Sequence, residues 1–171
     1  IVASGPNTAN QHAVPSDRVI EKGDFVLMDY GAGYCDYRSD MTRTVVMGEP
    51  TQEQLDLYAL VRCTHEECVA AIHPGVEGND IFKLSKKIIG DAGYGDYYNH
   101  GLGHGVGIDI HELPNFNRSK NIIEVGSVVT MEPGVYLPGV GGVRLEDYGV
   151  VTENGYEPFT KTPHDLHVID C

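Results

Sequence analysis

Three histidines and four glycines share one short stretch of the sequence, HGLGHGVGIDIHELP at residues 100–114. Imidazoles bind metals and transfer protons near neutral pH, so the stretch is a candidate for chemistry. A helix is disfavoured, because each glycine costs a helix interior roughly 1 kcal/mol relative to alanine. A nucleotide-binding loop is disfavoured too, because no start point satisfies G-x-G-x-x-G. The pattern predicts imidazoles on an extended or looped backbone, with room for a ligand or another strand. Taken alone, histidines packed within a sheet explain it equally well.

Two carboxylates lie in a predicted hairpin over residues 24–46, where β-rich runs flank a turn at 33–36. Asp29 interrupts the apolar run VLMDYG, and Asp40 lies on the returning arm. Such a hairpin places the two acids close to opposite one another. Like charges in an apolar strand are costly to bury without a partner, so we expect a cation between them.

A second predicted hairpin repeats this arrangement. Its β-rich runs are GSVVTMEPGVYLPG and GGVRLEDYGVV, with a turn near residues 138–139. Glu132 lies in the first run and Glu146 in the second. Two hairpins therefore each offer two inward carboxylates.

The four carboxylates and His104 form a candidate ligand set. For any single acid, pairing with a base such as Arg43 or Arg144 is an equally good interpretation. Together the five groups exceed what one divalent ion requires and suit two ions that share ligands. Such a pair can activate a water molecule as a nucleophile near neutral pH. Oxygen-rich ligation with one imidazole favours Mn²⁺, with Co²⁺ and Zn²⁺ as alternatives. The chemistry indicated is hydrolysis.

Two amphipathic helices separate the hairpins. The first is predicted from a Thr51 cap, with Gln54 completing a capping box, to a stop at Pro74-Gly75. The second spans about Asn79 to Ala92 and carries its apolar residues on one face. The order hairpin, helix, helix, strands, hairpin predicts an α+β fold in which helices cover one face of a mainly antiparallel sheet.

Length and charge bound the class of protein. The 171 residues suit a single domain spanning 1–171, and the formal net charge of −13 disfavours nucleic acid and membrane surfaces as partners. No apolar run is long enough to span a bilayer. The sequence opens on Ile1 without an initiator Met, which predicts a fragment. The cysteines show no disulfide-type spacing, which predicts reduced thiols and a cytoplasmic location; they are Cys35, Cys63, Cys68 and Cys171.

The motifs resemble a known family. HGLGHGVGIDIHE is similar to the signature of proline peptidases of the aminopeptidase P and Xaa-Pro dipeptidase type, which belong to the M24 metallopeptidases with the pita-bread fold. VLMDYG, SDMTRT, TMEPGVY and VRLEDYG resemble the remaining metal blocks, in the same order. The resemblance covers nearly the whole chain, from ASGPNTANQHAVPSD onward. It implies a curved sheet in a single catalytic domain, truncated so that the start of the pita-bread domain and any N-terminal domain are missing.

The resemblance implies roles for the five candidate ligands. Asp29 resembles the terminal carboxylate of one metal, and Asp40 and Glu146 resemble bridging carboxylates. His104 is similar to the single imidazole ligand of the second metal, with Glu132 beside it. Glu132 also resembles the general base, which takes a proton from water and passes it to the leaving nitrogen.

Other residues resemble the groups that contact substrate. His111 is similar to a histidine that contacts the scissile carbonyl and its developing oxyanion. His12, His100 and Arg144 resemble groups that line the proline subsite or assist proton transfer. Thr42 is suited to orient a ligand carboxylate. The remaining histidines match no motif and are interpreted as ordinary surface or core residues; they are His65, His73, His164 and His167.

The function implied is hydrolysis of an Xaa-Pro bond at the N-terminus of a dipeptide or short peptide by two divalent metal ions. The resemblance also allows a homodimer. Methionine aminopeptidase is a weaker alternative, because the spacing G-H-G-V-G-I-D-I-H-E follows the proline-peptidase pattern. A metal-free pita-bread binding module and a creatinase-like hydrolase are further alternatives, disfavoured because all five candidate ligands are present.

Overall fold

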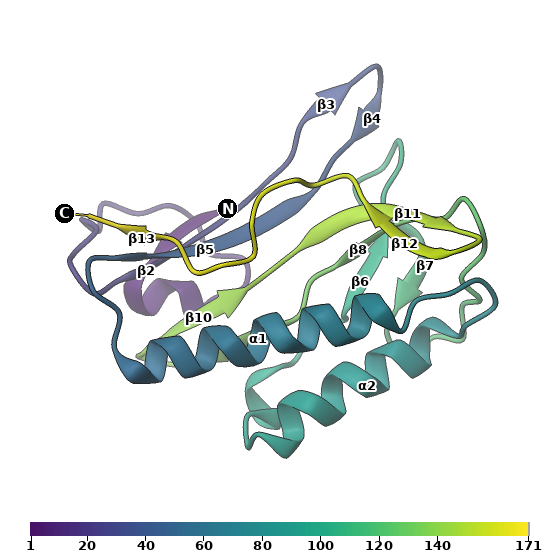
Figure 1. The fold of residues 1–171 in the computed structure, drawn as a ribbon. Coiled ribbons are helices and arrows are strands. Elements are labelled where there is room, and N and C mark those ends of the chain that lie inside the picture. The colour runs from purple at the N-terminus through teal and green to yellow at the C-terminus, as the bar shows by residue number, and fades with distance from the viewer. Residues whose placement is uncertain (171) are drawn as a thin grey trace.

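Two helices lie on one side of a set of curved strands in the computed structural model, which describes residues 1–170 (Figure 1). Helix α1 spans Gln52–Ala70 and α2 spans Gly78–Asp91. The predicted capping box is confirmed, because Gln54 N donates to the Thr51 hydroxyl and the Gln54 side chain accepts from Thr51 N. Helix α1 ends before the predicted stop at Pro74-Gly75, because Ala71 already serves as its C-cap.

The first sheet has the strand order β1-β2-β5-β13. It consists of β1 (Val2–Ser4), β2 (Phe25–Tyr30), β5 (Met41–Met47) and β13 (Val168–Ile169). Strands β2 and β5 form the predicted first hairpin in antiparallel register, and β13 adds a short parallel pairing to β5. The hairpin tip carries its own two-stranded ribbon, β3 (Gly33–Tyr34) and β4 (Tyr37–Arg38), which projects from the body of the molecule (Figure 1).

The second sheet has the order β12-β11-β8-β6-β7. Its strands are β6 (Gly103–Gly105), β7 (Glu112–Phe116), β8 (Val128–Met131), β11 (Asp147–Thr152) and β12 (Gly155–Pro158). Strands β9 (Gly134–Leu137) and β10 (Gly141–Arg144) pair as the tip of the predicted second hairpin, whose arms continue into β8 and β11. Short 3₁₀ turns at Gly5–Ala9 (η1) and Gly95–Tyr97 (η2) complete the described elements.

An isolated antiparallel bridge between Thr42 and Glu146 connects β5 to the start of β11, so the two sheets meet at this point. The apolar faces of α1 and α2 pack on the strands and form two buried clusters. One contains Leu57, Tyr58, Val61, Val135 and Val143, and the other contains Cys68, Ile81, Leu102, Phe116 and Val129. The predicted α+β architecture, a mainly antiparallel sheet with helices on one face, is confirmed.

Within residues 1–170, no helix is both long and apolar enough to cross a membrane. Cys35, Cys63 and Cys68 carry free thiols, and Cys171 lies outside the described residues.

Candidate metal centre and active site

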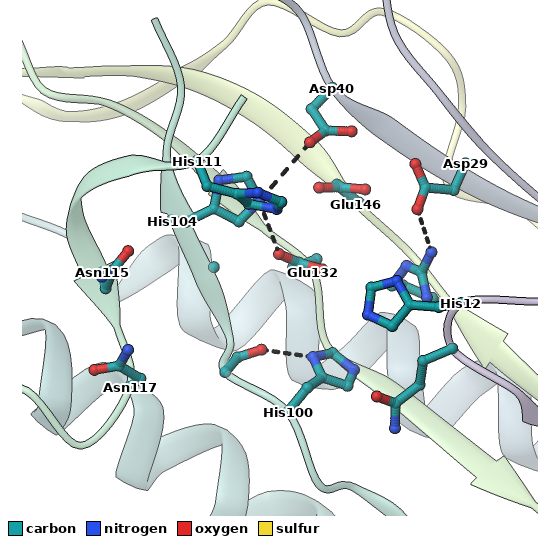
Figure 2. Close-up of a pocket in the computed structure, with 14 residues that line it drawn as sticks. His12, Asp29, Asp40, His100, His104, His111, Asn115, Asn117, Glu132 and Glu146 are labelled. Carbon is teal, nitrogen blue, oxygen red and sulfur yellow. Dashed lines mark hydrogen bonds and ion pairs between the residues drawn. The ribbon is translucent and has the colours of Figure 1, made fainter. Parts of the chain in front are cut away.

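The five candidate ligands line one cavity of about 270 Å³ (Figure 2). Each lies within a different strand or directly next to its end. Asp29 lies in β2, Asp40 precedes β5, His104 is the middle residue of β6, Glu132 follows β8, and Glu146 precedes β11. The four residues for which the sequence suggests contact with substrate line the same cavity: His12, His100, His111 and Arg144.

Strand β6 packs closely against the backbone of its neighbours, and this places His104 beside the candidate carboxylate ligands. A side chain at Gly103 would place its Cβ 2.2 Å from the Thr130 carbonyl oxygen, and one at Gly105 would lie 2.4 Å from the Leu113 carbonyl oxygen. The backbone N–H of His104 donates to the Thr130 hydroxyl at 3.0 Å. The glycines of the histidine-rich stretch therefore admit neighbouring strands, as the sequence suggests.

His104 turns one ring nitrogen toward the carboxylates. Its Nδ1 lies 3.0 Å from the Gly105 carbonyl oxygen, so Nδ1 carries the proton and Nε2 offers its lone pair. Nε2 lies 3.3 Å from Glu132 Oε1 and 3.8 Å from Asp40 Oδ2 (Figure 2). Burial lowers the pKa of His104, which favours the neutral imidazole that binds metals.

The buried acids repel one another. Burial raises the pKa of Glu132 and that of Asp40, and the charge of Asp29 adds to the effect, so that the two pKa values are about 8 and about 6. Glu146 is 2% exposed, and burial together with the charges of Glu132 and Asp40 raises its pKa well above the usual value. A cation among these oxygens would relieve both the desolvation and the repulsion.

The donor set fits divalent metal ions. One ligand atom from each of Asp40, His104 and Glu146 lies within 4.8 Å of the others, and Glu132 contacts the same imidazole. Carboxylate oxygens with one imidazole nitrogen suit Mn²⁺, Co²⁺ or Zn²⁺.

Asp29 differs from the other acids, because it forms an ion pair with Arg144. Arg144 is buried and also donates to the Thr42 hydroxyl at 3.0 Å and to the Tyr136 hydroxyl at 3.0 Å. Pairing of an acid with an arginine, one of the interpretations open from the sequence, thus applies to Asp29. Arg43 instead pairs with Asp147 at 2.6 Å.

His100 closes one end of the cavity. Its Nε2 lies 2.9 Å from the Tyr136 hydroxyl and its Nδ1 lies 2.6 Å from the Gly101 carbonyl oxygen. Its ring meets Tyr98 edge-on, with 5.2 Å between the ring centroids. Burial lowers the pKa of His100 to about 4, so this histidine is neutral near pH 7.

His111 and His12 are exposed at the mouth of the cavity. The His111 ring packs edge-on against His104, with the centroids 4.3 Å apart. His111 therefore lies beside the candidate imidazole ligand, where it can reach a group bound next to it (Figure 2).

Comparison with known proteins identifies the family. Residues 1–153 match the model of metallopeptidase family M24. The chain belongs to this family. It is 44% identical over 167 residues to the Xaa-Pro dipeptidase of Pyrococcus furiosus, covering 97% of this chain and 48% of that protein. Members of the family use divalent metal ions, which agrees with the donor set of the cavity.

Solved structures of the family share the fold. A prolidase from Pyrococcus horikoshii superposes with a TM-score of 0.94 at 42% identity, covering 97% of this chain and 48% of that one. An X-Pro aminopeptidase from Thermotoga maritima superposes with a TM-score of 0.96 at 36% identity, covering 99% and 48%. The chain spans about half the length of these family members.

Several residues of the cavity were missed by sequence reasoning. Thr130 donates to Glu132 Oε1 at 3.4 Å and accepts from His104, and Tyr136 connects His100 to Arg144. Thr130 lies two residues before Glu132 in an otherwise apolar run, so the two side chains are expected on the same face of the strand. That spacing could have identified Thr130 from the sequence. Three further polar residues line the cavity without a role predicted from the sequence: Gln11, Asn115 and Asn117.

Proposed function

We propose that this chain hydrolyses the bond between an N-terminal residue and a following proline, with two divalent metal ions held by its four carboxylates and His104. The observation that supports the proposal most directly is the convergence of these groups, from five separate strand positions, on one cavity (Figure 2). The name Xaa-Pro dipeptidase, carried by the Pyrococcus furiosus relative, supports the choice of bond.

The proposed ligands are those that the sequence suggests, with Asp29 terminal, Asp40 and Glu146 bridging, and His104 and Glu132 on the second ion. Divalent ions bound there would polarise the scissile carbonyl and lower the pKa of water toward neutrality. We propose Mn²⁺ as the preferred ion, with Co²⁺ and Zn²⁺ as alternatives, because the donors are mostly carboxylate oxygens.

Glu132 is the proposed general base. Its carboxylate is partly exposed to the cavity and lies 3.3 Å from His104 Nε2. In this position it takes a proton from the attacking water and passes it to the leaving proline nitrogen. His111, exposed beside His104, donates a hydrogen bond to the carbonyl oxygen as negative charge develops there.

The proline subsite is proposed to lie at the end of the cavity that carries His12 and His100. His100 is neutral and packs between the rings of Tyr98 and Tyr136, so it presents a rigid, largely apolar wall. Arg144 uses three nitrogens inside the protein, and it serves this site by holding Asp29 and Tyr136 in place.

The first test is the number of ions bound by metal-stripped protein, measured by calorimetric titration with Mn²⁺ and by elemental analysis. The second is release of the N-terminal residue from an Xaa-Pro dipeptide and an Xaa-Pro-Xaa tripeptide, with Xaa-Ala and Met-Ala peptides as controls. Two ions and release that depends on proline are expected. Absence of bound Mn²⁺, or equal rates on the alanine peptides, would contradict the proposal. The relative rates on dipeptide and tripeptide define the preferred substrate length.

The cytoplasmic location and the homodimer stay predictions from the sequence. So does the extent of the domain, residues 1–171.

A further inference from the structure

A second group of metal-binding side chains lies outside the catalytic cavity. It consists of His65 in α1, Asp147 at the start of β11 and His164 in the segment after β12. One ligand atom from each residue lies within 4.8 Å of the others. We propose that these three side chains bind one divalent ion of the zinc type, separately from the two catalytic ions.

The two sites face opposite sides of the strands. Thr42 bonds to the side chain of Glu146, whereas its neighbour Arg43 bonds to the side chain of Asp147. Adjacent residues of an extended chain point to opposite faces, so Glu146 faces the cavity and Asp147 faces away from it. None of the three proposed ligands lines the catalytic cavity.

His65 is the observation that calls for a ligand. The residue is 2% exposed, and within residues 1–170 neither Nδ1 nor Nε2 has a hydrogen-bond partner. A buried polar group without a partner is costly, and native proteins leave few of them. Nε2 lies 3.4 Å from Asp147 Oδ2, close to the separation of two ligand atoms on one tetrahedral ion. Burial lowers the pKa of His65 to about 4, so the ring is in the neutral form that metals require.

The two carboxylate oxygens of Asp147 have different partners. Oδ1 accepts from Arg43 at 2.6 Å and from Thr160 at 2.5 Å. Oδ2 is left to face the two imidazoles, with His164 Nε2 at 2.6 Å and His65 Nε2 at 3.4 Å. The positive charge of Arg43 therefore lies next to Oδ1, the carboxylate oxygen that does not face the proposed ion.

The geometry suits a zinc-type ion. Two ligand atoms that each lie about 2.0–2.1 Å from a tetrahedral ion are about 3.3 Å apart. His164 Nε2 and Asp147 Oδ2 would therefore have to move apart by less than about 1 Å to bind the ion. His164 can make that movement, because its side chain is 29% exposed. The same exposure leaves the fourth position to water. Two imidazoles and one carboxylate select Zn²⁺, Co²⁺ or Ni²⁺ over Mn²⁺.

An ion held in this way would join three segments of the chain. It would connect the middle of α1, the strand that follows Glu146, and the C-terminal segment, which also forms hydrogen bonds to Tyr58 and Arg62 of α1. An ion that binds the folded chain raises the midpoint of thermal unfolding. The expected role is to hold the C-terminal segment in place.

The test compares zinc content in three proteins. Wild-type chain and the variants His164→Gln and His167→Gln are equilibrated with equal Zn²⁺, freed of excess metal and measured by elemental analysis. His167 is an exposed histidine of the same segment and serves as the matched control. We expect His164→Gln to hold one ion fewer than the other two and to lose part of the zinc-dependent rise in unfolding temperature. Equal zinc content in all three proteins would overturn the proposal.

A crystal structure of protein grown with Zn²⁺ would locate the bound ion independently of the measured zinc content. An anomalous peak between the three side chains is expected, and anomalous signal confined to the catalytic cavity would show that the cluster is only a hydrogen-bonded group. This result does not depend on the proposed peptidase activity, because Mn²⁺ binding in the cavity is measured separately.

Discussion

The hydroxyl of Thr42 donates to Glu146 Oε2 at 2.6 Å, and the backbones of the same two residues form the bridge that connects the two sheets. Glu146 is thus oriented by a residue that is itself held by backbone pairing. Arg144 Nε donates to the same hydroxyl, so one oxygen atom fixes a proposed metal ligand and the arginine that holds Asp29.

Replacement of Thr42 by valine tests this arrangement. We expect Thr42→Val to lower metal affinity or turnover by roughly 10- to 100-fold, as is usual for groups that orient metal ligands. Unfolding free energy should fall by roughly 1–3 kcal/mol, because Arg144 and Glu146 lose a buried partner. Thr64→Val is the control, since Thr64 is buried in α1 and its hydroxyl donates to the Leu60 carbonyl of the same helix. A control with equally reduced metal affinity would show a general effect on folding.

The bridging carboxylates are tested by Asp40→Asn and Glu146→Gln. Each change removes a charge that the proposal assigns to both ions, so activity on an Xaa-Pro peptide is expected to disappear. Asp36→Asn, an exposed change at the hairpin tip, should leave activity intact. More than a few per cent of wild-type turnover at saturating Mn²⁺ in either variant would rule out the bridging assignment.

His111 separates catalysis from metal binding. His111→Ala should lower turnover by roughly 100-fold, because one hydrogen bond to the developing oxyanion is lost. Its content of Mn²⁺ should match the wild type, measured by elemental analysis. Loss of metal in this variant would show that His111 is a ligand, not a donor to the substrate.

The buried acids predict how the stability of metal-stripped protein varies with pH. Folding raises the pKa of Glu132 from its usual 4.5 to about 8, so its protonated form is favoured in the folded state. That contribution is complete below pH 4.5 and is lost as the pH rises through 8. Histidines with a lowered pKa, such as His65 and His100, make the folded state more stable as the pH rises. Their gain in stability is nearly complete at pH 7. Denaturant midpoints should therefore fall between pH 7 and pH 8.

Two further experiments test whether Glu132 causes the fall in denaturant midpoint between pH 7 and pH 8. Mn²⁺ should reduce it, because cations compensate the ionised carboxylates. Glu132→Gln should flatten it in metal-stripped protein. A wild-type midpoint that rises between pH 7 and pH 8 would show that Glu132 is ionised at little cost in the folded chain.

Glycine at position 103 is required by the packing of β6 on β8. Gly103→Ala is expected to lower unfolding free energy by roughly 2 kcal/mol or more, because its Cβ would lie 2.2 Å from the Thr130 carbonyl oxygen. Gly90→Ala in α2 places its new carbon more than 4 Å from the other segments of residues 1–170 and should stabilise the helix by roughly 0.5–1 kcal/mol. Opposite shifts in the urea midpoint are expected.

Much of the candidate site could be predicted from sequence because its residues occur in local patterns. Asp29 and Asp40 interrupt one hairpin, Glu132 and Glu146 interrupt another, and periodicity of two places them on shared faces. The capping box at Thr51 is likewise a local signal. These features depend on neighbours along the chain, so the sequence carries them directly.

Contacts between distant segments were not predictable in this way. His65, Asp147 and His164 meet only because α1 and the C-terminal segment pack on the same side of β11. No spacing rule connects them; from the sequence, His65 and His164 are interpreted singly as ordinary residues, and Asp147 is not singled out. Tyr136 was missed for a related reason, since its partners His100 and Arg144 belong to different segments.

The bridge between Thr42 and Glu146 also bears on the order of events during synthesis. The ribosome delivers Asp29 and Asp40 long before Glu132 and Glu146, so a nascent chain carries only part of the donor set. The proposed hydrolytic centre is assembled when β5 meets the start of β11, which is made long after β5. Peptide cleavage would then begin only after β11 has been made, and a chain that stalled before β11 would remain inert toward its neighbours.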